Sequence, residues 1–143
     1  MTALIQRVSS ASVQIDGKIK ASIQKGLLIF LGVRSGDDGK EAGMLARKTA
    51  ALRIFNDSAE KINLSVTDIS AEAMVLSQFT LCADTRKGNR PSFINAAQPD
   101  KAAPLYEEFV LQLRNIIGAG RVQTGEFGAD MKVELINDGP VTI

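Results

Sequence analysis

Four residues near the middle of the chain, Ser77-Gln78-Phe79-Thr80, could line a reactive site. They stand at the end of an apolar stretch, and polar side chains at the point where a buried strand ends often face a pocket. Neither hydroxyl has an evident base, because the chain contains no histidine, so a serine or threonine nucleophile is not self-evident. These residues alone favour the simpler interpretation that Ser77 and Thr80 are strand residues with local hydrogen bonds.

Composition narrows the chemistry further. The absence of histidine removes the commonest general base and metal ligand. The single cysteine, Cys82, excludes a disulfide within the chain and a zinc site made of cysteine clusters. No spacing pairs the carboxylates for acid–base work. We therefore expect no metal and no cofactor, and catalysis would have to come from carboxylates, hydroxyls, backbone groups or the substrate.

A basic, glycine-containing segment follows at residues 85–91. Its cationic side chains and backbone N–H groups could bind phosphates. The net charge is only +1, so any contact with a nucleic acid would have to be local. An exposed loop with no ligand explains the segment equally well. The cations in question are Arg86, Lys87 and Arg90.

Gly139-Pro140 stands close to the end of the chain, between two apolar runs. The ordinary interpretation of such a pair is a turn. A bond before proline is also where cis peptides occur, and a glycine without a side chain allows close approach of backbone carbonyls to a ligand. The pair therefore also suits a rigid backbone contact.

Hydrophobic periodicity predicts the elements that would position these residues. An uninterrupted apolar stretch at 27–33 indicates a strand buried on both faces. A long loop is expected over residues 84–100. The expected strands cover residues 4–8, 12–15, 19–23, 27–33, 53–55, 64–66, 73–81, 122–124 and 131–136.

Two helices are predicted. The first begins at Asp38, which can cap it, and its apolar stripe is formed by Met44, Leu45, Lys48 and Leu52. The second covers residues 101–117 and is ended by glycines. Its apolar face is formed by Leu105, Phe109, Leu113 and Ile116.

The strands do not alternate regularly with the helices, which favours an α+β fold over a doubly wound sheet. A chain of 143 residues suits one core, so we expect a single domain over residues 1–143. No apolar run approaches the roughly 20 residues of a membrane span. The first eight residues lack a secretory hydrophobic region, so we expect a cytoplasmic protein without a membrane partner.

The sequence resembles the D-aminoacyl-tRNA deacylase family along essentially its whole length. Two motifs, Ser77-Gln78-Phe79-Thr80 and Gly139-Pro140-Val141-Thr142, are specific as a pair, although each alone would be weak. The resemblance implies a compact, barrel-like α+β domain with an antiparallel or mixed sheet and two main helices. It also implies a homodimer.

The same resemblance assigns roles to individual residues. Ser77, Gln78, Phe79 and Thr80 should form the catalytic pocket around the scissile ester. The Gly139–Pro140 bond is expected to be cis and to enter the partner subunit's pocket, and Arg7 is expected to orient it. Three further residues are expected to contact the substrate: Ala102 near the amino acid, and Phe127 and Met131 at the terminal adenosine.

The implied activity is hydrolysis of the ester bond of D-aminoacyl-tRNA, and of glycyl-tRNA, to release free tRNA and the amino acid. The mechanism we favour is assisted by the ribose 2′-hydroxyl, with backbone N–H groups stabilising the oxyanion. Thr80 as a covalent nucleophile is the alternative mechanism. A non-catalytic RNA-binding module is the competing function, and a carboxylate-based metal hydrolase fits less well. No DNA partner is expected.

Overall fold

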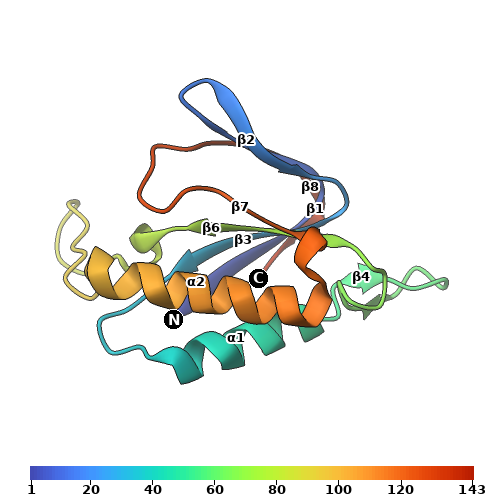
Figure 1. The fold of residues 1–143 in the computed structure, drawn as a ribbon, viewed down its shortest axis with the longest axis horizontal. Coiled ribbons are helices and arrows are strands. Elements are labelled where there is room, and N and C mark those ends of the chain that lie inside the picture. Colours follow the sequence, from blue (N-terminus) through green and yellow to red (C-terminus); the bar gives the residue numbers. More distant parts are fainter.

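The computed structural model describes all residues, 1–143. It contains eight strands, two α-helices and two short 3₁₀ helices (Figure 1). In chain order these are β1 (Thr2–Ile15), β2 (Lys18–Ile23), β3 (Gly26–Gly32), α1 (Gly39–Ala51), β4 (Phe55–Asn56), β5 (Ile62–Leu64), β6 (Glu72–Ser77), η1 (Phe79–Cys82), α2 (Pro99–Ile117), η2 (Ala119–Arg121), β7 (Val122–Thr124) and β8 (Lys132–Thr142).

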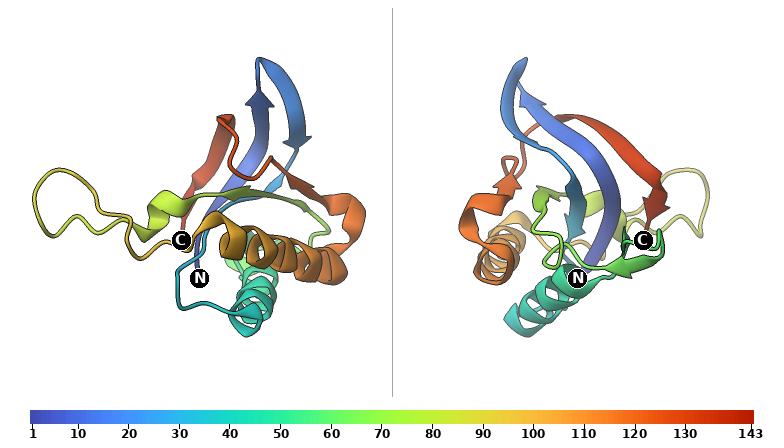
Figure 2. Two further views of the ribbon diagram at one scale, coloured as in Figure 1. Left: turned by 60° about the vertical axis from the view of Figure 1, so that its left-hand side comes forward. Right: turned by 90° about the vertical axis from the view of Figure 1, so that its right-hand side faces the viewer.

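Six of the strands form one mixed sheet in the order β2-β1-β3-β6-β7, with β8 paired to β1. The long strand β1 is antiparallel to β2, β3 and β8, whereas β3, β6 and β7 run parallel to one another. Residues 2–8 of β1 pair with β3 and residues 11–15 with β2, while β8 follows the opposite edge. The curvature of β1 bends the sheet into a nearly closed barrel (Figure 2), which confirms the predicted fold class.

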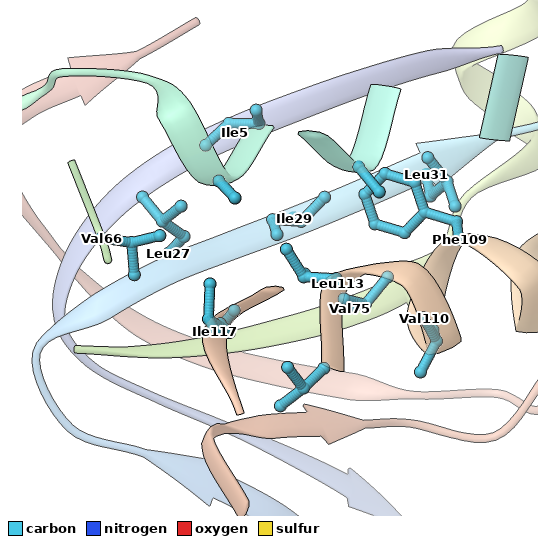
Figure 3. Packing of buried hydrophobic residues seen from close by; sticks show 14 of the residues in the cluster. Ile5, Leu27, Ile29, Leu31, Val66, Val75, Phe109, Val110, Leu113 and Ile117 are labelled. Carbon is cyan, nitrogen blue, oxygen red and sulfur yellow. The ribbon is translucent and has the colours of Figure 1, made fainter. Parts of the chain in front are cut away.

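Strand β3 is buried on both faces, as its apolar sequence predicted. Leu27 and Ile29 pack into the larger core, between the sheet and the helices (Figure 3). Leu28, pointing the other way, packs into a smaller cluster inside the curved sheet. Burying each such side chain contributes about 1.5–3 kcal/mol. The centre of the sheet is therefore a firm base for the segment that follows β6.

Helix α1 begins where predicted, because Asp38 caps it and forms a capping box with Glu41. The predicted apolar stripe is wrong in part: Leu45 and Leu52 pack against the core, but Met44 is 60% exposed and Lys48 is exposed too. The buried face instead carries small residues, chiefly Ala42, Ala46 and Ala50, since α1 packs beside α2 and small side chains allow close approach.

Helix α2 starts with proline at its first turn and ends at Gly118, which has φ of +103°. Two residues of its predicted face, Phe109 and Leu113, are fully buried. The prediction for Ile116 is wrong, because Ile117 is buried in its place and Ile116 is 37% exposed.

Five predictions about the strands need correction. The strands expected at 53–55 and 64–66 are the short β4 (Phe55–Asn56) and β5 (Ile62–Leu64). The two expected strands at 4–8 and 12–15 form one continuous strand, β1, and the last strand continues to Thr142. The strand expected over 73–81 ends at Ser77, and the next residues form η1. The chain turns there against Gly32, where an added Cβ would lie 3.0 Å from the Gln78 carbonyl oxygen. The Gln78 carbonyl can lie this close because position 32 has no side chain, and local periodicity does not encode such a contact with another strand.

Candidate active site

A cavity of about 600 Å³ opens where the end of β6 meets the beginning of α2. Those two ends lie next to each other in the fold (Figure 1). Its lining is mostly apolar, and the β6–η1 turn contributes a few polar groups to it. A concave, largely apolar site with few polar groups is the usual form of a small-molecule pocket.

Six of the residues singled out from the sequence line this cavity, and they come from three separate parts of the chain. They are Ser77, Gln78, Phe79, Ala102, Phe127 and Met131. Thr80 lies at the edge rather than in the lining, and its hydroxyl accepts a hydrogen bond from the Gln78 side-chain amide. Arg7, Gly139, Pro140 and the basic segment do not line it.

The turn that ends β6 leaves two backbone donors without partners. The amides of Phe79 and Thr80 open η1 and so have no carbonyl partner within that helix, and neither is a donor in the hydrogen bonds of the turns and caps, whereas Gln78 N–H bonds to the Leu31 carbonyl (2.8 Å). The first N–H groups of any helix lack partners, and η1 begins at Phe79. Two adjacent free N–H groups beside an apolar cavity can stabilise an oxyanion.

Aromatic side chains build the cavity wall on the α2 side. The Tyr106 hydroxyl donates to the Val75 carbonyl at 2.8 Å, and its ring lies 5.8 Å from that of Phe127. Burial, with a smaller contribution from the Glu107 charge, raises the pKa of Tyr106 well above its ordinary value. Tyr106 is therefore a neutral structural phenol. Tyr106 is not among the residues predicted for the site, although it lies on the buried face of α2.

Met131 reaches the cavity because of a glycine. A Cβ on Gly125 would collide with the Met131 sulfur and lie 2.8 Å from a Leu76 methyl group. Only glycine at 125 leaves room for Met131 in its present place.

No strong nucleophile or base stands in the cavity. The single cysteine, Cys82, is buried, its thiol lies 3.5 Å from the Val33 carbonyl oxygen, and burial raises its pKa. The one carboxylate in the lining, Asp130, is highly exposed and paired with Lys132 at 3.0 Å. No group of three or more carboxylate or thiol side chains gathers in a way that could hold a metal ion.

The Gly139–Pro140 bond is cis and lies on the exposed edge of β8. Beside it, the Arg7 side chain is buried and donates from Nε to the Asp138 carbonyl (2.7 Å). Nη1 of Arg7 donates to the Ile54 carbonyl (2.7 Å). Arg7 therefore ties this loop to the segment before β4, and the loop lies outside the cavity of its own chain.

The basic segment forms a loop that projects from the molecule (Figure 2). Asp84 and Ser92 close its base through two backbone hydrogen bonds (2.8 and 2.9 Å). Arg86 forms an ion pair with Asp84 at 2.6 Å, which lowers the pKa of that carboxyl. Lys87 and Arg90 are exposed and make no ion pair, so they are the freer cations.

Neither α1 nor α2 has the length and apolar character that crossing a membrane requires.

Among solved structures, that of a c-Myc DNA unwinding element binding protein is 40% identical, with a TM-score of 0.96 over all of this chain and 96% of the other. The structure of a probable eukaryotic D-amino acid tRNA deacylase superposes with a TM-score of 0.85 over 99% of this chain and 96% of the other. At 17% identity, that second likeness shows the fold alone.

Sequence relatives are more specific. A protein of Flavobacterium psychrophilum named D-aminoacyl-tRNA deacylase is 59% identical over this whole chain and 95% of its own length. One of the same name from Akkermansia muciniphila is 54% identical with the same coverage. The family model described as D-Tyr-tRNA(Tyr) deacylase matches residues 4–143. The chain therefore belongs to the D-Tyr-tRNA(Tyr) deacylase family and is a D-aminoacyl-tRNA deacylase, a hydrolase acting on an ester bond.

Proposed function

We propose that the cavity holds the aminoacylated 3′ end of tRNA, with the scissile ester at the β6–η1 turn. The observation that carries this assignment is the pair of free backbone N–H groups at Phe79 and Thr80. Attack of water on the ester carbon creates a tetrahedral oxyanion, and two preorganised donors in an apolar surrounding stabilise it. The terminal adenosine contacts Phe127 and Met131, and Ala102 lies near the amino acid.

The group that helps to activate water comes from the substrate. Neither Thr80 nor Ser77 has a histidine, and the only carboxylate in the cavity wall, Asp130, is already paired with a lysine. The ribose 2′-hydroxyl is next to the ester and can assist the attacking water. The residues of the turn hold the ester and orient it. Thr80 supplies a backbone donor, and its hydroxyl accepts a hydrogen bond from the Gln78 side chain rather than acting as a nucleophile.

The loop at Gly139 and Pro140 selects chirality. Its backbone carbonyls collide with an L side chain, whereas a D side chain points outward. Glycine has no side chain to reject, so glycyl-tRNA is also a substrate. Gly139 suits this role because it adopts φ of +144° and a Cβ there would lie 3.1 Å from Nη2 of Arg7.

The loop serves the cavity of a second copy of the chain. It lies outside its own cavity, on a β8 edge that also exposes apolar side chains, with Ile136 62% and Ile143 56% exposed. A second copy would cover these side chains and receive the loop, and two-fold symmetry makes the exchange reciprocal. The enzyme is then a homodimer with two shared sites that acts in the cytoplasm.

The free cations of the projecting loop, Lys87 and Arg90, contact tRNA phosphates, and Arg86 contributes less because Asp84 neutralises it. The competing function is nucleic-acid binding without turnover. The name of one structural relative, a DNA unwinding element binding protein, gives that alternative a specific reason. A net charge of +1 supports a local RNA contact over general DNA binding.

One assay separates the two functions. The protein is incubated with D-tyrosyl-tRNA and L-tyrosyl-tRNA, with and without a chelator, and release of the amino acid is followed. We expect turnover of the D isomer alone, unaffected by chelation. Binding without turnover would support the binding module, and equal hydrolysis of both isomers would remove the chirality assignment.

A further inference from the structure

The pairing of β8 with β1 shifts register at two places, and the larger irregularity lies opposite Arg7. Val8 pairs with Asn137 and Gln6 pairs with Thr142, so four residues of β8 stand opposite the single residue Arg7. The segment 138–141 bulges out of the sheet as a consequence. Because the ladder is interrupted there, its backbone groups need other partners, and these decide where Gly139 and Pro140 lie.

The side chain of Asn137 supplies the missing partners. Its Oδ1 accepts a hydrogen bond from the Val141 N–H at 2.8 Å, and its Nδ2 donates to the Val141 carbonyl at 3.1 Å. A primary amide carries a donor and an acceptor side by side, as a peptide unit does. Asn137 therefore pairs with Val141 in the way that an opposing strand residue would.

A second contact fixes the amide itself. Nδ2 of Asn137 also donates to the Thr142 hydroxyl at 3.2 Å, and that hydroxyl accepts from the Gln6 side chain at 3.2 Å. At the other end of the bulge, Arg7 holds the Asp138 carbonyl. The loop is thus closed by two anchors of different kinds, an arginine at its start and an asparagine amide across its base.

We propose that Asn137 is a positioning residue that determines stereochemical specificity, because its side-chain amide closes the 138–141 loop and places the Gly139 and Pro140 carbonyls. This inference rests on the proposed role of that loop as the chirality filter. Asn137 does not line the cavity, so it leaves the groups that handle the ester untouched. Loosening the loop should therefore relax the exclusion of L substrates more than it slows D substrates.

The test compares Asn137→Ala and Asn137→Asp with an Asn115→Ala control, which changes an exposed residue of α2 outside the cavity. We expect Asn137→Ala to lower the ratio of kcat/KM for D-tyrosyl-tRNA over L-tyrosyl-tRNA at least about ten-fold, mainly through faster hydrolysis of the L isomer. The ratio for Asn137→Asp should lie between those of the unaltered protein and Asn137→Ala, because the carboxylate can still accept a hydrogen bond from the Val141 N–H. The control should keep the original ratio.

A folded Asn137→Ala protein with an unchanged ratio would overturn the inference. Amide hydrogen exchange gives a second readout that does not depend on the variant folding. In the unaltered protein the Val141 N–H should exchange slowly, and rapid exchange would also overturn the proposal. The proposed function fails in a different way, since an unaltered protein with no preference for the D isomer would exclude a chirality filter altogether.

Discussion

The cavity and the Gly139–Pro140 loop are held in place by different means. The cavity wall rests on packing: Tyr106 is buried against Phe127, and the β6–η1 turn rests on Gly32 of the central strand β3. The loop is exposed and lies outside the sheet ladder, and a few hydrogen bonds from Arg7 and Asn137 hold it.

This difference separates two properties of the enzyme. Packing spreads its contribution over many contacts, so a wall made this way tolerates the loss of one polar atom. A loop held by a few hydrogen bonds moves when one is removed. We therefore expect changes in the cavity to alter rate and affinity for both isomers alike, and changes in the loop to alter the ratio between isomers.

The largest effect should come from the substrate. D-tyrosyl-tRNA that ends in 2′-deoxyadenosine should react about 10²–10⁴-fold more slowly, the range for loss of a positioned proton-transfer group. Thr80→Ala should retain a measurable rate with the normal substrate, because its backbone N–H is kept. Single-turnover release of tyrosine measures both. Normal reaction of the deoxy substrate, together with an inert Thr80→Ala, would favour the threonine nucleophile.

The projecting loop should give an intermediate effect on both isomers. Replacing Lys87 and Arg90 together by alanine should weaken tRNA binding and reduce the slope of log affinity against log salt by about 1–2, since fewer counterions are released. Titrations of D-tyrosyl-tRNA and L-tyrosyl-tRNA at several salt concentrations measure it. Lys40 and Lys48, two exposed lysines, form the matched control for lost charge. If the slope of log affinity against log salt fell equally in the Lys87/Arg90 and Lys40/Lys48 variants, the projecting loop would have no specific contact with tRNA.

The smallest effect should come from the cavity wall. Tyr106→Phe removes one hydrogen bond and should lower the free energy of unfolding by about 1 kcal/mol. The part of the cavity wall formed by Phe127 loses some support, so KM should rise a few-fold with kcat little changed. The ratio of kcat/KM between the D and L substrates should stay constant. Denaturant melts and steady-state kinetics check both parts. A changed D-to-L ratio would contradict the expectation that the cavity affects both isomers alike and that the loop alone selects between them.

Local patterns predicted the parts of the fold that depend on neighbours in the sequence. Asp38 caps α1 because the capping box lies within four residues, and the uninterrupted apolar run of β3 reveals a strand buried on both faces. The buried face of α1 could not be predicted in the same way, because contact with α2 selects the alanines over Met44.

The candidate site also depends on contacts between distant residues, which local sequence patterns do not predict. The close approach of Gln78 to β3 depends on Gly32, and the place of Met131 depends on Gly125. The contact between Arg7 and Asp138 joins residues 131 positions apart, and only the resemblance to a known family led to expecting it. Patterns of a few residues carry no information about such contacts.

The most direct test of a site made from two chains uses two inactive variants. One replaces Gly139 and Pro140 in the loop, and the other replaces Gln78 and Phe79 in the cavity. Co-expression with two affinity tags isolates the mixed dimer. It should recover about half the unaltered activity with D-tyrosyl-tRNA, because the intact cavity of the first chain meets the intact loop of the second. A folded mixed dimer without activity would contradict the shared site.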